Sequence, residues 1–157
     1  MKLFGYADTN SWMKVMGFML ALFSSTSAYA VDEINTTYFG NLAIKGYDPV
    51  AYFTENRPVE GDKKFEYKWK NATWRFSSEH NLSLFKTHPE QYEPQYGGYC
   101  AYAVAKDSTA DIDPSQFTVH EGRLYLNYNK KVNVRWLADR DAFILEANRN
   151  WPKLLEK

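Results

Sequence analysis

The chain has 157 residues, with 19 basic and 19 acidic side chains and an aromatic fraction of 17%. This length fits one domain, or one domain with an appendage. Because the formal net charge is zero and no basic run exceeds two residues, the positive patch that nucleic-acid binding needs is missing, and we expect no nucleic-acid partner.

Residues 1–30 have the pattern of a secretory signal peptide. A basic start precedes an apolar run over residues 15–23, and Ala28-Tyr29-Ala30 supplies a small-x-small cleavage motif. The apolar run is too short to span a bilayer, which takes roughly 20 residues, so cleavage is favoured over a membrane anchor. We therefore expect an exported, soluble mature chain over residues 31–157, in a Gram-negative periplasm rather than fully secreted, with no membrane contact after cleavage.

The first predicted elements of the mature chain are short. Residues 42–45 indicate a strand that leads into a turn, and Asp48 is placed to cap a helical turn that begins at Pro49. Residues 54–64 are polar and contain Pro and Gly, which is typical of a loop.

A hairpin and a helix follow. Residues 65–69 and 73–76 alternate between apolar and polar side chains, which predicts a β-hairpin with one buried face. Ser77 and Ser78 are suited to capping a helix, and that helix is expected to end before Pro89.

The second half of the chain also contains a predicted hairpin followed by a helical segment. Residues 97–105 contain two glycines followed by alternating small and aromatic side chains, which fits either a helix start or a strand. Residues 117–120 and 123–128 predict a second hairpin, and the apolar spacing over residues 132–151 is helical until Pro152. Two hairpins with interleaved helices and no βαβ alternation predict a small single α+β domain with short helices and a C-terminal helical segment.

Four motifs follow one another along the mature chain. They are Gly-Tyr-Asp-Pro-Val-Ala-Tyr-Phe at residues 46–53, Trp-Arg-Phe-Ser-Ser-Glu-His at 74–80, Pro-Glu-Gln-Tyr-Glu-Pro-Gln-Tyr-Gly-Gly-Tyr-Cys-Ala at 89–101 and Leu-Tyr-Leu-Asn-Tyr-Asn at 124–129. In this order they resemble the exported, single-domain branch of the YHS domain family over about residues 41–154. The resemblance implies a small α+β domain related to zinc- and copper-binding modules that serve metal sensing, trafficking and transport.

The chain departs from the metal-binding members of that family at three positions. Those members have Cys where this chain has Ala51, and a Cys-x-x-x-Cys pair where it has Ser77 and Asn81. Thiolates hold Cu(I) and Zn(II) in such sites, and Ala has no coordinating atom. Any metal site must therefore use other residues.

Cys100 and His80 are the candidate metal ligands. Cys100 is the only Cys of the chain, and it follows two glycines at an expected helix start, where backbone N–H groups favour the thiolate. His80 lies close in sequence to the missing ligand positions. Our leading hypothesis is an exported, non-enzymatic binding module for a transition metal such as copper or zinc, with Cys100 and His80 as ligands. The alternative interpretation is a buried, inert Cys100 and a solvent-exposed His80.

Two other functions are kept open. In one, Cys100 is the nucleophile of a thiol-dependent redox or transfer protein, with a nearby His as its base. In the other, the protein is an interaction domain with an aromatic ligand pocket, built from Tyr47, Tyr52, Trp74, Tyr96, Tyr99 and Tyr102. No Ser-His-Asp order, phosphate-binding glycine loop or His-Glu-x-x-His motif occurs in the sequence, so a non-enzymatic role is favoured.

Overall fold

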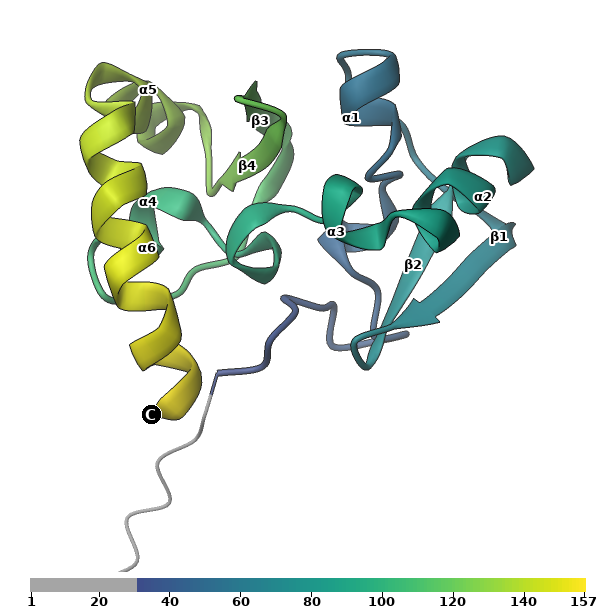
Figure 1. The fold of residues 1–157 in the computed structure, drawn as a ribbon, viewed down its shortest axis with the longest axis horizontal. Coiled ribbons are helices and arrows are strands. Elements are labelled where there is room, and N and C mark those ends of the chain that lie inside the picture. The colour runs from purple at the N-terminus through teal and green to yellow at the C-terminus, as the bar shows by residue number, and fades with distance from the viewer. Residues whose placement is uncertain (1–30) are drawn as a thin grey trace, which may run out of the picture.

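The computed structural model describes residues 31–157 (Figure 1). The predicted signal peptide over residues 1–30 lies outside the described part. The described chain is α+β, as the sequence predicts, and contains two antiparallel two-stranded sheets. The strands are β1 (Asp62–Trp69), β2 (Ala72–Phe76), β3 (Asp113–His120) and β4 (Arg123–Asn127). The helices are η1 (Ile44–Gly46), α1 (Ala51–Thr54), α2 (Glu79–Thr87), α3 (Pro89–Tyr92), η2 (Gln95–Gly98), α4 (Ala101–Ala105), α5 (Lys130–Ala138) and α6 (Arg140–Glu156).

Both predicted hairpins are confirmed, and each closes through a two-residue turn. Lys70 and Asn71 join β1 to β2, with φ angles of 49° and 59°. Glu121 and Gly122 join β3 to β4, with φ angles of 50° and 71°. Two consecutive residues with positive φ give a turn whose twist matches that of the flanking strands, which explains why these loops can be so short.

The buried side chains form two clusters. In the first, the ring of Phe85 on α2 lies 5.0 Å from the ring of Trp74 on β2. In the second, Tyr125 on β4 packs against Trp136 on α5 with ring centroids 5.3 Å apart, and α6 contributes Ala147. Figure 1 shows the corresponding arrangement, with the β1–β2 hairpin and α2 on one side and α4, α5 and α6 on the other.

Several predicted boundaries are wrong. β1 begins at Asp62, inside the predicted loop over residues 54–64, and Asp139 divides the predicted helical segment over residues 132–151 into α5 and α6. Residues 42–45 form isolated bridges followed by η1, because Ile44 and Lys45 adopt positive φ angles that a strand does not allow. The last helix does not end before Pro152 but continues through it to Glu156. Pro152 removes one helical hydrogen bond, but burial of Leu154 in the second cluster holds the final turn in place.

Local capping signals agree with the structure. The side chain of Ser78 accepts a hydrogen bond from the backbone N–H of Asn81 at the start of α2. Of the two alternatives for residues 97–105, the helix is confirmed, as α4. Within residues 31–157, the structure has no helix that combines the length and apolar character needed to cross a membrane.

Candidate functional site

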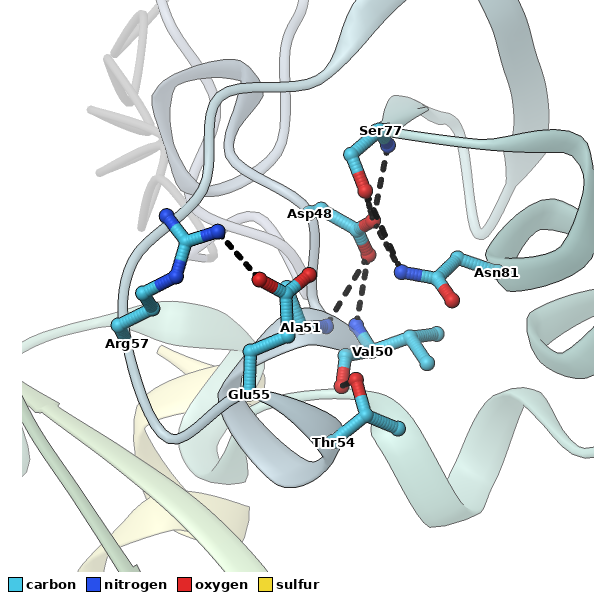
Figure 2. A network of polar contacts seen from close by, with 8 residues as sticks. All are labelled: Asp48, Val50, Ala51, Thr54, Glu55, Arg57, Ser77 and Asn81. Carbon is cyan, nitrogen blue, oxygen red and sulfur yellow. Dashed lines mark hydrogen bonds and ion pairs between the residues drawn. The ribbon is translucent and has the colours of Figure 1, made fainter.

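A buried hydrogen-bond network surrounds Asp48 (Figure 2). Asp48 is 0% exposed, and its Oδ1 atom accepts hydrogen bonds from the N–H groups of Val50 at 2.8 Å and Ala51 at 3.3 Å. The predicted capping role of Asp48 is therefore confirmed, although α1 itself begins at Ala51 rather than at Pro49.

The other carboxylate oxygen of Asp48 binds Ser77, which directly follows β2, and Asn81 on α2. Its Oδ2 atom accepts hydrogen bonds from the backbone N–H of Ser77 at 2.8 Å, from the Ser77 hydroxyl at 2.7 Å and from the Asn81 amide at 2.7 Å. A carboxylate has about four lone-pair positions, and here five donors share them. Asp48 is thus saturated by the protein itself and connects the α1 turn to the start of α2.

The same network contains the positions at which the resembling metal-binding proteins have cysteines. Ser77, Asn81 and the backbone of Ala51 all contact the Asp48 carboxylate, as Figure 2 shows. These groups do not fit copper or zinc, because Ala51 has no ligand atom and the oxygen and amide atoms are engaged with one another. The network is a structural connection between segments, and no metal chemistry is derived from it.

Cys100 is buried next to β4. It is 1% exposed, its backbone N–H donates to the carbonyl of Ala110 at 3.0 Å, and its thiol donates to Oδ1 of Asn127 at 3.5 Å. Asn127 is itself buried, accepts the N–H of Tyr102 at 3.2 Å and donates to Asn133 at 3.1 Å. The thiol is therefore part of a packed polar cluster.

His80 lies apart from this cluster. It is exposed in the first turn of α2, whereas the described hydrogen-bond partners of Cys100 are Val104, Ala110 and Asn127, none of which is on α2. Within residues 31–157, no three His, Cys, Asp or Glu side chains are grouped so that they could hold a metal ion. The structure thus shows the arrangement described by the alternative interpretation, a buried Cys100 and an exposed His80.

The six aromatic residues proposed to wall one pocket belong to different clusters. Trp74 and Tyr52 are buried in the first cluster, where the Tyr52 hydroxyl donates to the carbonyl of Pro114 at 3.0 Å. Tyr96 is buried in the second cluster, and Tyr99 and Tyr102 pack against it. Of the six, Tyr96 lines the hollow described next.

A surface hollow of about 390 Å³ lies where Tyr96 and Trp151 meet, and we call it the Tyr96–Trp151 hollow. The two rings are 6.2 Å apart, and the Tyr96 hydroxyl donates to Oδ1 of Asn148 at 2.9 Å. Burial raises the pKa of Tyr96, which keeps this hydroxyl protonated as a donor. The charged residues that line the hollow are Glu33, Lys70, Glu90, Glu93 and Arg123.

Three of the lining residues, Glu33, Lys70 and Glu93, form an ion-pair triad. Lys70 Nζ lies 2.7 Å from a Glu33 oxygen and 3.2 Å from a Glu93 oxygen. Although partial burial acts to lower it, the pKa of Lys70 is raised, because the two carboxylates favour the ammonium. Burial raises the pKa of Glu93, and the attraction of Lys70 offsets only part of this effect. The positive charge of Lys70 is thus balanced by one carboxylate, and the triad as a whole carries one excess negative charge.

Sequence reasoning missed this hollow. Glu33, Lys70, Glu93 and Trp151 are far apart in the chain, and no motif or spacing connects them. The available signal was indirect: Trp151 belongs to a helical apolar pattern.

Comparisons with known proteins leave the family of this chain open. The resemblance to the YHS family rests on the four sequence motifs and stays a prediction. No protein-family model, no curated protein and no solved structure matches the chain.

Proposed function

We propose that this protein is a non-enzymatic binding module that holds a small organic cation in the Tyr96–Trp151 hollow. The observation that carries the proposal is that the Trp151 ring and three carboxylates share one concave surface. The carboxylates are those of Glu33, Glu90 and Glu93, and they outnumber the basic lining residues Lys70 and Arg123 by one. Aromatic faces attract ammonium and guanidinium groups, and carboxylates are their usual hydrogen-bond partners.

The size and chemistry of the hollow support binding rather than catalysis. Its volume of about 390 Å³ lies within the range of about 300–1,000 Å³ that is typical of ligand pockets. Among the described residues that line it, none is Ser, Thr, Cys or His, so the usual pairing of a nucleophile with a His base is missing there.

The buried Cys100 argues against the two functions that depend on its thiol. To reach a metal ion or an electrophile, the thiol would have to leave its contact with Asn127 inside the first cluster. The Tyr96–Trp151 hollow needs no such rearrangement, which is why we place the ligand there.

The test is an NMR titration of the purified protein with N-acetyl-lysine methylamide in low salt. We expect shifts centred on the Trp151 indole and a dissociation constant on the order of 1 mM, as suits a ligand of this size. Glu90→Gln should weaken binding, because it removes a lining carboxylate. Glu146→Gln is the matched control, because Glu146 is on α6 but does not line the hollow.

The proposal would be wrong if the lysine derivative caused no shifts near Trp151. It would also be wrong if N-acetyl-glutamate methylamide bound equally well, since an anion should be repelled by the lining carboxylates.

A further inference from the structure

A second hollow of about 510 Å³ continues from the first. It lies between the β3–β4 turn and the N-terminal part of α6, and it is lined there by His120, Glu121 and Asp141. The two hollows share Gln95, Arg123 and Asn148. Because the same three residues border both, the two hollows are neighbours along α6, and we refer to them together as the groove.

One face of α6 borders both hollows. The lining residues of α6 are Asp141, Ile144, Leu145, Asn148, Trp151 and Pro152. Their spacing follows the helical repeat, so they form a single stripe about 16 Å long from the first residue to the last. Figure 1 shows α6 running from beside α5 to the C-terminus along the edge of the molecule. The two hollows together thus border a length of α6 that exceeds what one small cation needs.

The length of the stripe matches an extended polypeptide. A strand-like segment rises about 3.3 Å per residue, so five residues span about 16 Å. A single lysine-like cation would occupy the Tyr96–Trp151 hollow and leave the second hollow empty.

The charge of the groove favours a basic occupant. Its lining contains two basic residues, Lys70 and Arg123, and five acidic residues, which are Glu33, Glu90, Glu93, Glu121 and Asp141. The lining therefore has a net charge of −3, with His120 counted as neutral, whereas the whole of residues 31–157 has a net charge of −1. Glu33 and Glu93 are paired with Lys70, and Asp141 lies 3.0 Å from Arg140. The least compensated carboxylates are therefore those of Glu90 in the first hollow and Glu121 in the second.

Helix α6 also offers a backbone acceptor. Pro152 has no N–H group, so the carbonyl of Asn148 lacks its usual helical donor. Asn148 and Pro152 both line the Tyr96–Trp151 hollow, where this carbonyl can accept a hydrogen bond from an ammonium, a guanidinium or a peptide N–H.

We propose that the two hollows form one docking groove along α6 and that its occupant is an extended basic segment of a polypeptide about five residues long. This proposal rests on the proposed function and names the ligand class of the same site. Binding combines one basic side chain against Trp151 and Glu90 with a second one near Glu121.

The experiment measures the fluorescence anisotropy of fluorescein-labelled pentalysine with the purified protein in low salt. We expect Glu90→Gln and Glu121→Gln to weaken pentalysine binding about two- to fivefold each, as loss of an exposed charge pair does. Glu146→Gln should leave it unchanged, although it removes the same charge and lies on α6, the helix that borders both hollows. N-acetyl-lysine methylamide should be sensitive to Glu90→Gln and insensitive to Glu121→Gln, because it fills only the first hollow.

Three results would overturn the groove. If N-acetyl-lysine methylamide binds at Trp151 but pentalysine binds no more tightly, the proposed function stands and the extended ligand is refuted. If Glu146→Gln weakens pentalysine binding as much as Glu121→Gln does, the peptide is held by unspecific charge. If labelled pentaglutamate binds better than pentalysine, the assignment of a basic occupant is wrong.

Discussion

Replacing Asp48 with Ala is expected to destabilise the fold strongly. The change leaves donors of Val50, Ala51, Ser77 and Asn81 without their buried acceptor. The two N–H groups of the α1 turn correspond to a lost helix cap, worth about 0.5–2 kcal/mol. The Ser77 N–H and the Asn81 amide each become unsatisfied at about 1–3 kcal/mol. These contributions add up to a loss of about 2.5–8 kcal/mol, a large share of the roughly 5–15 kcal/mol that stabilises a domain.

Urea unfolding followed by circular dichroism measures this loss. Asp62→Ala is the matched control, because Asp62 is exposed and its carboxylate accepts a single N–H, that of Lys64, at 2.9 Å. We expect the control to cost no more than about 1 kcal/mol. The loss of unfolding free energy for Asp48→Asn should lie between those for Asp48→Ala and Asp62→Ala. Asn keeps one acceptor oxygen, but it turns an NH₂ group toward donors.

The reasoning about the network fails on either of two results. One is a loss below about 1 kcal/mol for Asp48→Ala with an unchanged denaturant slope, which would mean that the five hydrogen bonds contribute little to stability. The other is an equal loss for Asp62→Ala, which would mean that burial of the carboxylate is irrelevant.

Three further predictions concern side chains outside the groove. Although burial acts to raise it, the pKa of Asp111 is lowered, chiefly by a hydrogen bond from Lys45. The stability that the ionised Asp111 carboxylate contributes is present at neutral pH and is lost as the pH falls below 3.8 through the folded-state pKa. In urea unfolding, the midpoint of the wild type should therefore exceed that of Asp111→Asn at pH 7, and the two midpoints should converge in strong acid. Cys100 should react with iodoacetamide more than about 100-fold more slowly in native buffer than in urea, and Cys100→Ser should not change the affinity for Cu(I) or Zn(II); equal labelling rates or a weakened metal affinity would contradict its burial. Trp136→Phe should cost about 1 kcal/mol less than Trp74→Phe in urea unfolding, because the indole N–H of Trp136 has no partner in the described chain, whereas that of Trp74 donates to a carbonyl at 3.1 Å; the reverse order would refute this.

Local patterns predicted most of the elements of the described chain. The alternation of apolar and polar residues located both hairpins, and short polar side chains located the caps at Asp48 and Ser78. Besides the start of β1 and the break between α5 and α6, the errors lie at residues 42–45 and at Pro152, where a local rule was outweighed. Positive φ angles interrupt the first segment, and burial of Leu154 stabilises the helical turn beyond the proline.

Sequence reasoning reached the residue types of the candidate sites but not their partners. It identified Asp48 as a cap, yet the contacts of Asp48 with Ser77 and Asn81 join residues 29 and 33 positions apart. It paired Cys100 with His80, whereas in the structure the thiol contacts Asn127.

The capping, the turns and the hydrophobic alternation depend on neighbours within a few residues, so they can be read from the amino-acid order. The Asp48 network and the groove along α6 depend on how distant segments pack. Those contacts are selected by burial of the two hydrophobic clusters and by the hydrogen bonds that buried polar groups must make. Periodicity shows which face of an element is buried, but it does not show which distant segment that face meets.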